Sequence, residues 1–364
     1  MGFSCGIVGL PNVGKSTLFN AITAAGAKVA NYPFTTIEPQ VGIVQVPDAR
    51  LDKLMGIFKP PKLLPTTIEF VDIAGLVKDA SKGEGLGNQF LSHIREVDAI
   101  AHVVRCFENK DVAHVEEGLD PKRDVEIIQT ELLLKDLDTV EKKLHEVAKK
   151  VKTGDKKVRL EIDFLSRLKE HLGTGKTAHA MTVHENEHEF FRCLFLLSSK
   201  PVMYVANTDE GGLIHDTNCL KAVKEIAQRE STMVIVVDAE IEAEITGMAY
   251  EEREDFLRDL GLSESGLDKV IREGYSLLNL ITFFTHNEKE LHAWTIRRGT
   301  KAPQAAGKIH SDFERGFIRA EVMKYADLER LGSEHLLKEK GLLAVHGHDY
   351  VVEDGDVMYF RFNV

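Results

Sequence analysis

The segment Gly9–Thr17 has the residue types and spacing of a loop that binds nucleotide phosphates. It reads G-L-P-N-V-G-K-S-T and contains the pattern G-x-x-x-x-G-K-[ST], placed directly after the apolar run Cys5–Val8 and before a helical pattern. Glycines let successive backbone N–H groups point inward, and the helix N-terminus adds positive partial charge. We expect Lys15 to contact the β- and γ-phosphates and the Ser16 hydroxyl to ligate Mg²⁺. The expected phosphate contacts are Asn12, Val13, Gly14, Lys15, Ser16 and Thr17.

An acidic residue that completes such a site follows a second apolar run, Ile68–Ile73. Residues 72–75 form the pattern D-x-x-G. Asp72 is expected to hold Mg²⁺ through a water, and the Gly75 amide to contact the γ-phosphate. Between the two motifs, Thr36 is the expected third metal ligand and Thr35 its rival; the alternative is an ordinary loop threonine.

The residue after the D-x-x-G pattern is Leu76, where many GTPases have a glutamine that orients the attacking water. Leucine has no hydrogen-bonding group. The sequence therefore predicts slow intrinsic hydrolysis that another residue, a monovalent cation or a partner accelerates. His114 is a candidate for positioning the water; the alternative is a solvent-facing loop histidine.

A third motif position follows the apolar run Pro201–Ala206, where GTPases carry N-K-x-D. Here the residues are Asn207, Thr208, Asp209 and Glu210, so both the lysine and the final aspartate are replaced. Asn207 keeps an amide for the purine, whereas Thr208 has no stem to cover it and the carboxylate of Glu210 is displaced by one methylene. We expect ATP to be preferred, with GTP secondary. The alternative is that Glu210 reaches guanine after a small loop shift.

Short apolar runs bounded by turn residues are expected to be the buried strands that position these motifs. They are Cys5–Val8, Val41–Val46, Ile68–Ile73, Ile100–Val104, Val202–Ala206 and Met233–Val237. Helical patterns such as Ser16–Ala25 and Gln89–Glu96 lie between several of them. This alternation predicts an α/β fold with a mostly parallel sheet covered on both faces.

One stretch interrupts this alternation with a heptad pattern. Its apolar residues are Leu133, Leu137, Val140, Leu144, Val147 and Val151. After a turn at 153–155, helical spacing resumes at Leu165, Leu168 and Leu172. We expect an insertion of two antiparallel helices, a coiled-coil arm, at about 122–195.

The pattern changes again near residue 279. Four apparent strands follow, at Leu280–Phe284, Leu291–Trp294, Phe317–Val322 and Val357–Phe362, with a short helix at about Pro303–Phe313. We expect residues 1–278 to form the nucleotide domain, including the arm, and residues 279–364 to form a separate α+β domain.

Composition excludes several classes of protein. The 364 residues carry a formal charge of −12, which argues against coating nucleic acid through the overall field. Four scattered cysteines without a C-x-x-C pair favour a reduced, cytoplasmic setting over a disulfide framework. No apolar stretch approaches the roughly 18 to 20 residues that span a bilayer, so we expect no membrane association.

Together these motifs resemble the YchF-type Obg-like ATPases. The resemblance is carried by 9–17, by NYPFTTIEP at 31–39, by 72–75 with the glycine-rich 82–88, by 207–210 and by VEDGDVMYFRFNV at 352–364. It covers nearly the whole chain. It implies a translation-factor-class P-loop domain, a coiled-coil insertion and a C-terminal TGS domain of ubiquitin-like β-grasp fold. Asn12 resembles the asparagine that helps hold K⁺ in related GTPases, so K⁺ is a candidate second cation.

The resemblance also implies a ribosome-associated ATPase, and the arm is the expected contact. Residues 142–159 hold eight basic and two acidic residues, a local charge of +6. Such a patch fits ribosomal RNA, while the alternative is a solvated helix face. The TGS domain is the rival contact, although its net charge is −1.

The predicted function is therefore a Mg²⁺-dependent nucleotide hydrolase that acts as a switch on the ribosome or its RNA. A GTP-specific GTPase of the Obg class is one alternative, and a metabolic P-loop kinase is a second. A kinase is expected to carry an arginine-rich lid, whereas the arm is lysine-rich. A non-hydrolysing RNA-binding protein would leave Ser16, Thr36 and Asp72 without a role.

Overall fold

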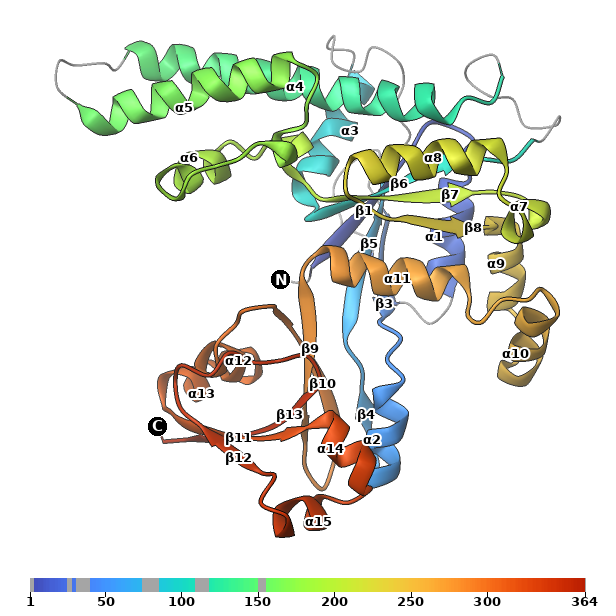
Figure 1. Cartoon of the computed structure of the whole chain (residues 1–364), viewed down its shortest axis with the longest axis vertical. Helices are drawn as coiled ribbons and strands as arrows, with labels where there is room; N and C mark the ends of the chain where they lie inside the picture. Colours follow the sequence, from blue (N-terminus) through green and yellow to red (C-terminus); the bar gives the residue numbers. More distant parts are fainter. Residues whose placement is uncertain are drawn as a thin grey trace. The chain divides into compact units, whose positions relative to one another are not determined.

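The computed structural model describes residues 3–24, 28–30, 40–73, 85–108, 118–149 and 155–363. The chain divides into two compact units (Figure 1). The first comprises Phe3–Ile43 and Glu69–Val270, and the second Val44–Ile68 and Ile271–Val364. Among the described residues, no helix combines the length and the apolar character needed to cross a membrane.

The first unit is built on a seven-stranded sheet of order β2-β3-β5-β1-β6-β7-β8. The strands are β1 (Ser4–Val8), β2 (Lys28–Ala30), β3 (Gln40–Gln45), β5 (Thr67–Asp72), β6 (Ala99–Arg105), β7 (Val202–Asn207) and β8 (Val234–Val237). Strand β1 pairs in parallel with β5 and β6, and β6, β7 and β8 continue in parallel, while β2 and β3 are antiparallel. Every residue of β6 is buried, as expected for a central strand covered on both faces. The predicted mostly parallel sheet is confirmed.

The helices of this unit are α1 (Lys15–Ala24), α3 (Gly85–Glu96), α4 (Pro121–Lys149), α5 (Lys156–Gly173), α6 (His188–Cys193), α7 (Glu210–Ile214), α8 (Asn218–Arg229), α9 (Ala239–Thr246), α10 (Tyr250–Asp259) and α11 (Gly266–Leu277). Of these, α1, α4 and α8 pack on strands of the sheet. The buried face of α8, with Leu220, Val223 and Ile226, packs with Tyr204 and Val104 of the sheet. This packing follows from apolar residues at helical spacing.

The arm consists of α4 and α5, which lie side by side (Figure 1). Their seam is apolar: Val140 and Val147 of α4 pack with Phe164 and Leu168 of α5. The Asp155 carboxylate caps α5 by accepting from the N–H groups of residues 157 and 158. The same core also contains Phe190 and Leu194 from the segment around α6. The arm therefore has a third packed segment that the heptad pattern does not predict.

The second unit holds a six-stranded mixed sheet of order β12-β11-β13-β9-β10-β4. Its strands are β4 (Leu63–Leu64), β9 (Leu280–His286), β10 (Leu291–Arg297), β11 (Phe317–Lys324), β12 (Ala344–His346) and β13 (Asp356–Phe362). Its helices are α2 (Arg50–Phe58), α12 (Ala302–Ile309), α13 (Ser311–Arg315), α14 (Tyr325–Leu331) and α15 (Glu334–Glu339). The parallel pair β9 and β13 lies between the antiparallel partners β10 and β11, which is the β-grasp arrangement expected for this part of the chain.

Two features of this unit differ from the sequence-based expectation. The segment Val44–Ile68 belongs to the second unit, because Leu51 and Leu54 of α2 share a core with Leu291 and Met323, whereas the prediction placed it in the first domain. The helix expected at 303–313 is two helices, which are separated by His310 in extended conformation.

Candidate functional site

The phosphate-binding loop connects β1 to α1 at the carboxyl edge of the first sheet. Its turn depends on two left-handed residues, Asn12 with φ 62° and Gly14 with φ 93°. The N–H of Leu18 then donates to Gly14 O at 2.9 Å and starts the helix. A cavity of about 390 Å³ opens beside the loop, and its lining is Asn12, Gly14, Lys15, Ser16, Thr17, Phe107, Glu108, Asn207, Thr208, Asp209, Asp238, Ala239 and Glu240.

The two loop glycines are required by close contacts. A Cβ on Gly9 would lie 2.6 Å from the carbonyl oxygen of Val103, and one on Gly14 would lie 2.2 Å from Asn207 Nδ2. Distances this short exclude a side chain unless the neighbouring atoms move. The motif glycines therefore allow the loop to lie against β6 and the end of β7.

Lys15 is held inside the loop. Its Nζ donates to Leu10 O at 2.7 Å, and the residue is 8% exposed. Burial lowers the pKa of Lys15 to about 8, and the negative charge of Asp72 opposes this shift. Near neutral pH the ammonium group keeps its proton, so it can bind a phosphate oxygen that enters the loop.

Asp72 ends β5 and lies close enough to Lys15 and Ser16 to interact with both. Burial raises the pKa of Asp72, while the charge of Lys15 and a hydrogen bond from Ser16 oppose the increase. Its Oδ1 is buried and has no hydrogen-bond partner among the described residues. Such an atom is normally satisfied by water or an ion. Two adjacent oxygen donors, the Ser16 hydroxyl and the Asp72 carboxylate, fit the inner and outer shells of Mg²⁺, respectively.

Asn207 holds the loops of the site rather than leaving its amide open to a base. Its Nδ2 donates to Val13 O at 3.0 Å, and its Oδ1 accepts from the N–H of Ala239 at 3.0 Å. Thr208, the next residue, is 3% exposed and its hydroxyl donates to Cys106 O at 3.4 Å. Both residues line the cavity, as expected, but these contacts make Asn207 a brace between two loops.

The acidic residues at this end of the cavity cap helices. The Asp209 side chain accepts from the N–H of Gly212 at 3.0 Å at the start of α7, and Asp238 accepts from the N–H groups of residues 240 and 241 at the start of α9. Glu210 is the first residue of α7, is exposed, and is not part of the cavity lining. Asp209, and not Glu210, is the acidic residue of this motif that lines the cavity.

Phe107 and Glu108 of the cavity lining were not predicted, and neither was Arg105, which contacts Phe107. Phe107 lines the cavity, and the Arg105 guanidinium carbon lies 4.5 Å from the centre of its ring. A signal was present in the sequence: a cation directly follows a buried apolar run whose carboxyl end meets the same sheet edge as the runs before Asp72 and Asn207.

Three predicted site residues, Thr36, Gly75 and His114, lie outside the described residues, as does Leu76. Of the others, the structure brings Asn12, Gly14, Lys15, Ser16, Thr17, Asn207 and Thr208 together around one cavity. Val13 is buried beside it and takes part through its carbonyl.

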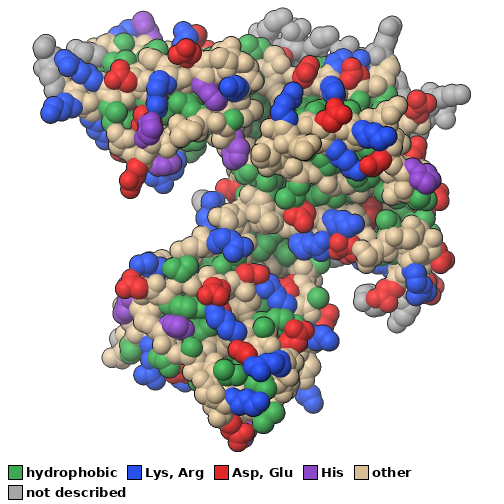
Figure 2. All heavy atoms as spheres, in the orientation of Figure 1, with side chains coloured by type: hydrophobic (Ala, Val, Ile, Leu, Met, Phe, Trp, Pro, Cys, Tyr) green, Lys and Arg blue, Asp and Glu red, His purple; other side chains and the backbone are tan. Residues whose placement is uncertain are grey.

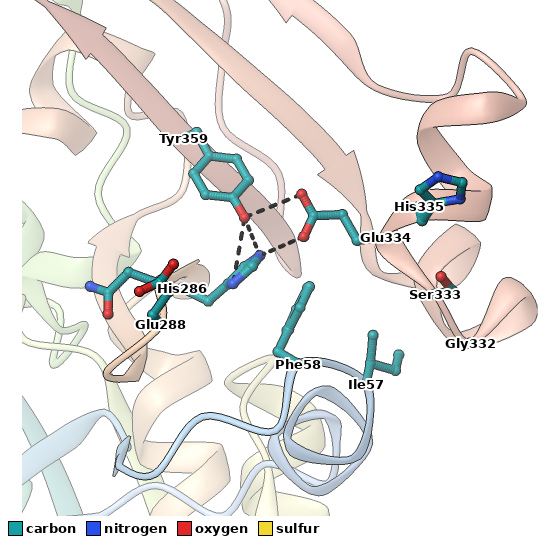
Figure 3. Close-up of a pocket in the computed structure, with 10 residues that line it drawn as sticks. Ile57, Phe58, His286, Glu288, Gly332, Ser333, Glu334, His335 and Tyr359 are labelled. Carbon is teal, nitrogen blue, oxygen red and sulfur yellow. Dashed lines mark hydrogen bonds and ion pairs between the residues drawn. The ribbon is translucent and has the colours of Figure 1, made fainter.

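The second unit contains a cavity of its own, of about 620 Å³ (Figure 3). At its centre the His286 ring stacks on Phe58 at 3.5 Å, and His286 Nε2 lies 3.3 Å from Glu334 Oε2. The Tyr359 hydroxyl contacts His286 and donates to Glu334 Oε1 at 3.3 Å. Burial lowers the pKa of His286, which favours the neutral ring. The polar contacts join β9, β13 and α15, and the ring stack of Phe58 adds α2.

The parallel sheet, the glycine loop that begins a helix, and the buried Lys15 and Asp72 beside it define the class of P-loop nucleoside-triphosphate hydrolases. Two family models match the chain. Residues 4–153 match a family described as 50S ribosome-binding GTPase. Residues 280–363 match the YchF-GTPase C-terminal family, described as a protein of unknown function.

Relatives match over the full length. The chain is 54% identical to the ribosome-binding ATPase YchF of Escherichia coli O157:H7 and 53% identical to that of Bacillus subtilis strain 168, with all of each chain covered. A solved structure of the Schizosaccharomyces pombe YchF GTPase superposes with a TM-score of 0.89 at 39% identity, covering 99% of this chain and 98% of that one. The chain belongs to the YchF family.

Proposed function

We propose that the chain hydrolyses ATP in preference to GTP, in a Mg²⁺-dependent reaction, as a ribosome-associated switch. The observation that carries the hydrolase is the geometry beside the phosphate loop. Lys15, which is 8% exposed, lies close to Asp72, whose Oδ1 has no hydrogen-bond partner in the part of the chain that the structure describes. A buried cation and an unsatisfied carboxylate at a glycine loop suit a triphosphate with its metal ion.

Each residue has a distinct task in this reaction. The Lys15 ammonium leaves Leu10 O and binds the β- and γ-phosphate oxygens, where it stabilises the charge that develops in the transition state. Ser16 and Asp72 are the residues that would hold Mg²⁺, the hydroxyl directly and the carboxylate through a water. The metal, when bound, neutralises phosphate charge and orients the γ-phosphate. Thr36, Gly75 and His114 remain predictions for the third metal ligand, the γ-phosphate contact and the water-positioning group, and K⁺ remains a candidate activator at Asn12.

The preference for adenine rests on the base side of the cavity. Reading guanine requires a carboxylate that accepts from two neighbouring N–H groups of the base, and an unmatched buried polar group costs about 1–3 kcal/mol. Glu210, at the sequence position of that carboxylate, is exposed and outside the lining, and Asp209 already accepts from Gly212 N–H. Phe107 offers a ring that can stack on either purine.

The relatives carry both names, ATPase and GTPase, so the base preference needs a direct measurement. Dissociation constants for ATP and GTP are compared in the native chain and in a Thr208→Lys plus Glu210→Asp variant. We expect tighter binding of ATP by the native chain and a shift toward GTP in the variant. A roughly tenfold native preference for GTP refutes the adenine assignment.

The ribosome contact is proposed for the arm, with the C-terminal β-grasp unit as the rival or second contact. The relatives are named ribosome-binding ATPases. Lys149, Lys156 and Arg159 are exposed at the end of the arm, where Figure 2 shows basic side chains gathered. Lys157 lies 3.2 Å from Glu189 and Lys142 2.8 Å from Asp138, so part of the local charge is already paired. The remaining exposed cations suit RNA phosphates.

A further inference from the structure

Arg105 is a buried cation that the proposed phosphate chemistry does not use. It ends β6, is 3% exposed, and does not itself line the nucleotide cavity. Burying a guanidinium is costly unless opposite charge and hydrogen bonds compensate it. Burial lowers the pKa of Arg105, and the negative charge of the buried Asp124 opposes that shift. A side chain kept at this cost beside the phosphate loop calls for an explanation.

The contacts of Arg105 reach both sides of the nucleotide site. Its Nη1 donates to Asn12 O at 3.4 Å, in the phosphate loop. Its Nε donates to Phe107 O at 3.2 Å, and its guanidinium lies over the Phe107 ring, which lines the cavity and is the surface proposed above for the base. One planar group therefore touches the phosphate-loop turn and an aromatic ring of the cavity wall.

Arg105 and Asn207 occupy equivalent positions in two neighbouring strands. The two are register partners at the carboxyl ends of the parallel strands β6 and β7. Asn207 binds the carbonyl of Val13, and Arg105 binds the carbonyl of Asn12, so neighbouring strands hold two consecutive carbonyls of the loop. Asn12 has φ 62°, a left-handed conformation that asparagine adopts more readily than most non-glycine residues and that the bond from Arg105 to its carbonyl helps to fix.

We propose that Arg105 is a positioning residue of the nucleotide site, which fixes the left-handed turn at Asn12 and the Phe107 ring through one guanidinium. This inference rests on the proposed nucleotide hydrolysis. The guanidinium group is needed because its N–H donors point in different directions, Nη1 toward Asn12 O and Nε toward Phe107 O. Lysine would retain the charge but would not make both contacts with the same geometry.

The test compares Arg105→Met and Arg105→Lys with the native chain and with Arg258→Met, a matched control whose side chain is 73% exposed on α10. Binding of ATP and of inorganic tripolyphosphate is measured with Mg²⁺, together with kcat and KM. Arg105→Met is expected to weaken ATP binding at least ~10-fold and tripolyphosphate binding by less, since tripolyphosphate does not use the Phe107 wall. In Arg105→Lys, the increase in log Kd for ATP over the native chain is expected to be more than half of the increase in Arg105→Met.

Arg105→Lys keeps the test decisive if Arg105→Met does not fold, because it removes the planar guanidinium and retains the charge. Phe107→Leu is the comparison that removes only the ring, and it is expected to weaken ATP binding and to leave tripolyphosphate binding unchanged. Native kcat and KM per folded Arg105→Met molecule, or full recovery by Arg105→Lys, would overturn the proposal. If instead the native chain and Lys15→Ala release phosphate equally slowly, the proposed function fails, which is a result distinguishable from a failure at Arg105 alone.

Discussion

Gly14 and Asn207, 193 residues apart in the sequence, are in such close contact that a Cβ on Gly14 would lie 2.2 Å from Asn207 Nδ2. The same Nδ2 donates to Val13 O, so the contact that excludes a side chain is part of the bond that shapes the loop. The phosphate loop is therefore shaped by the end of β7 as well as by its own glycines.

Gly14→Ala is expected to abolish tight nucleotide binding while the chain stays folded. The new Cβ must displace Asn207, and alanine at φ 93° adds strain of about 1–3 kcal/mol. Calorimetric titration with ATP checks this, with Gly56→Ala as the control, because a Cβ there meets nothing within 4 Å. If Gly14→Ala binds ATP with native affinity, the close contact between Gly14 and Asn207 is contradicted.

Asn207→Ala is expected to weaken ATP binding by roughly 10- to 100-fold. It removes the donor to Val13 O and the acceptor for Ala239 N–H, and each unsatisfied buried group costs about 1–3 kcal/mol. Tripolyphosphate affinity should fall as well, because the defect is in the loop. If tripolyphosphate binds as in the native chain, Asn207 acts on the base rather than as a brace.

ATP affinity should fall as the pH rises through about 8. Burial lowers the pKa of Lys15 to about 8 in the free protein, and the phosphates bind the protonated form. The triphosphate itself is fully ionised above its last pKa of roughly 6 to 7, so its charge is constant in this range. Titrations between pH 7 and 9.5 measure the change, with Lys15→Ala as a control that lacks the titrating group. A flat profile in the native chain speaks against phosphate binding by Lys15.

Replacement of Lys149, Lys156 and Arg159 by glutamine should weaken ribosome co-sedimentation and reduce its dependence on salt. Each cation that neutralises a phosphate adds about 0.7 to 0.9 to the slope of log K against log salt. The control replaces Lys122, Lys221 and Lys224, which are exposed on the first unit away from the end of the arm; Lys122 and Lys224 are paired with Glu225 and Asp216. An unchanged slope in the arm variant means that these residues form only a solvated face.

The features that depend on short-range sequence patterns were predicted from the sequence. The phosphate loop, the buried strands and the seam of α4 and α5 follow from glycine spacing and apolar periodicity, which need no knowledge of distant residues. Asp72 follows from its place at the end of a predicted strand.

Contacts between distant segments could not be predicted in the same way. Val44–Ile68 joins the second unit because α2 packs on a sheet more than 200 residues later in the chain. Arg105 and Phe107 belong to the site because β6 ends beside β7 and β1, which sequence periodicity does not reveal. The choice between Asp209 and Glu210 depends on which residue caps α7, a one-residue shift that composition does not determine.

The most direct test of nucleotide hydrolysis at this site is phosphate release from ATP by the native chain, Lys15→Ala and Asp72→Asn, with and without Mg²⁺. A small-molecule acceptor is absent, so a kinase reaction is excluded as the source of turnover. We predict slow, Mg²⁺-dependent release by the native chain and a decrease of at least ~100-fold in both variants, as expected when a phosphate clamp or metal-binding carboxylate is lost. Release that needs no Mg²⁺, or that both variants retain at the native rate, would contradict the assignment of this site.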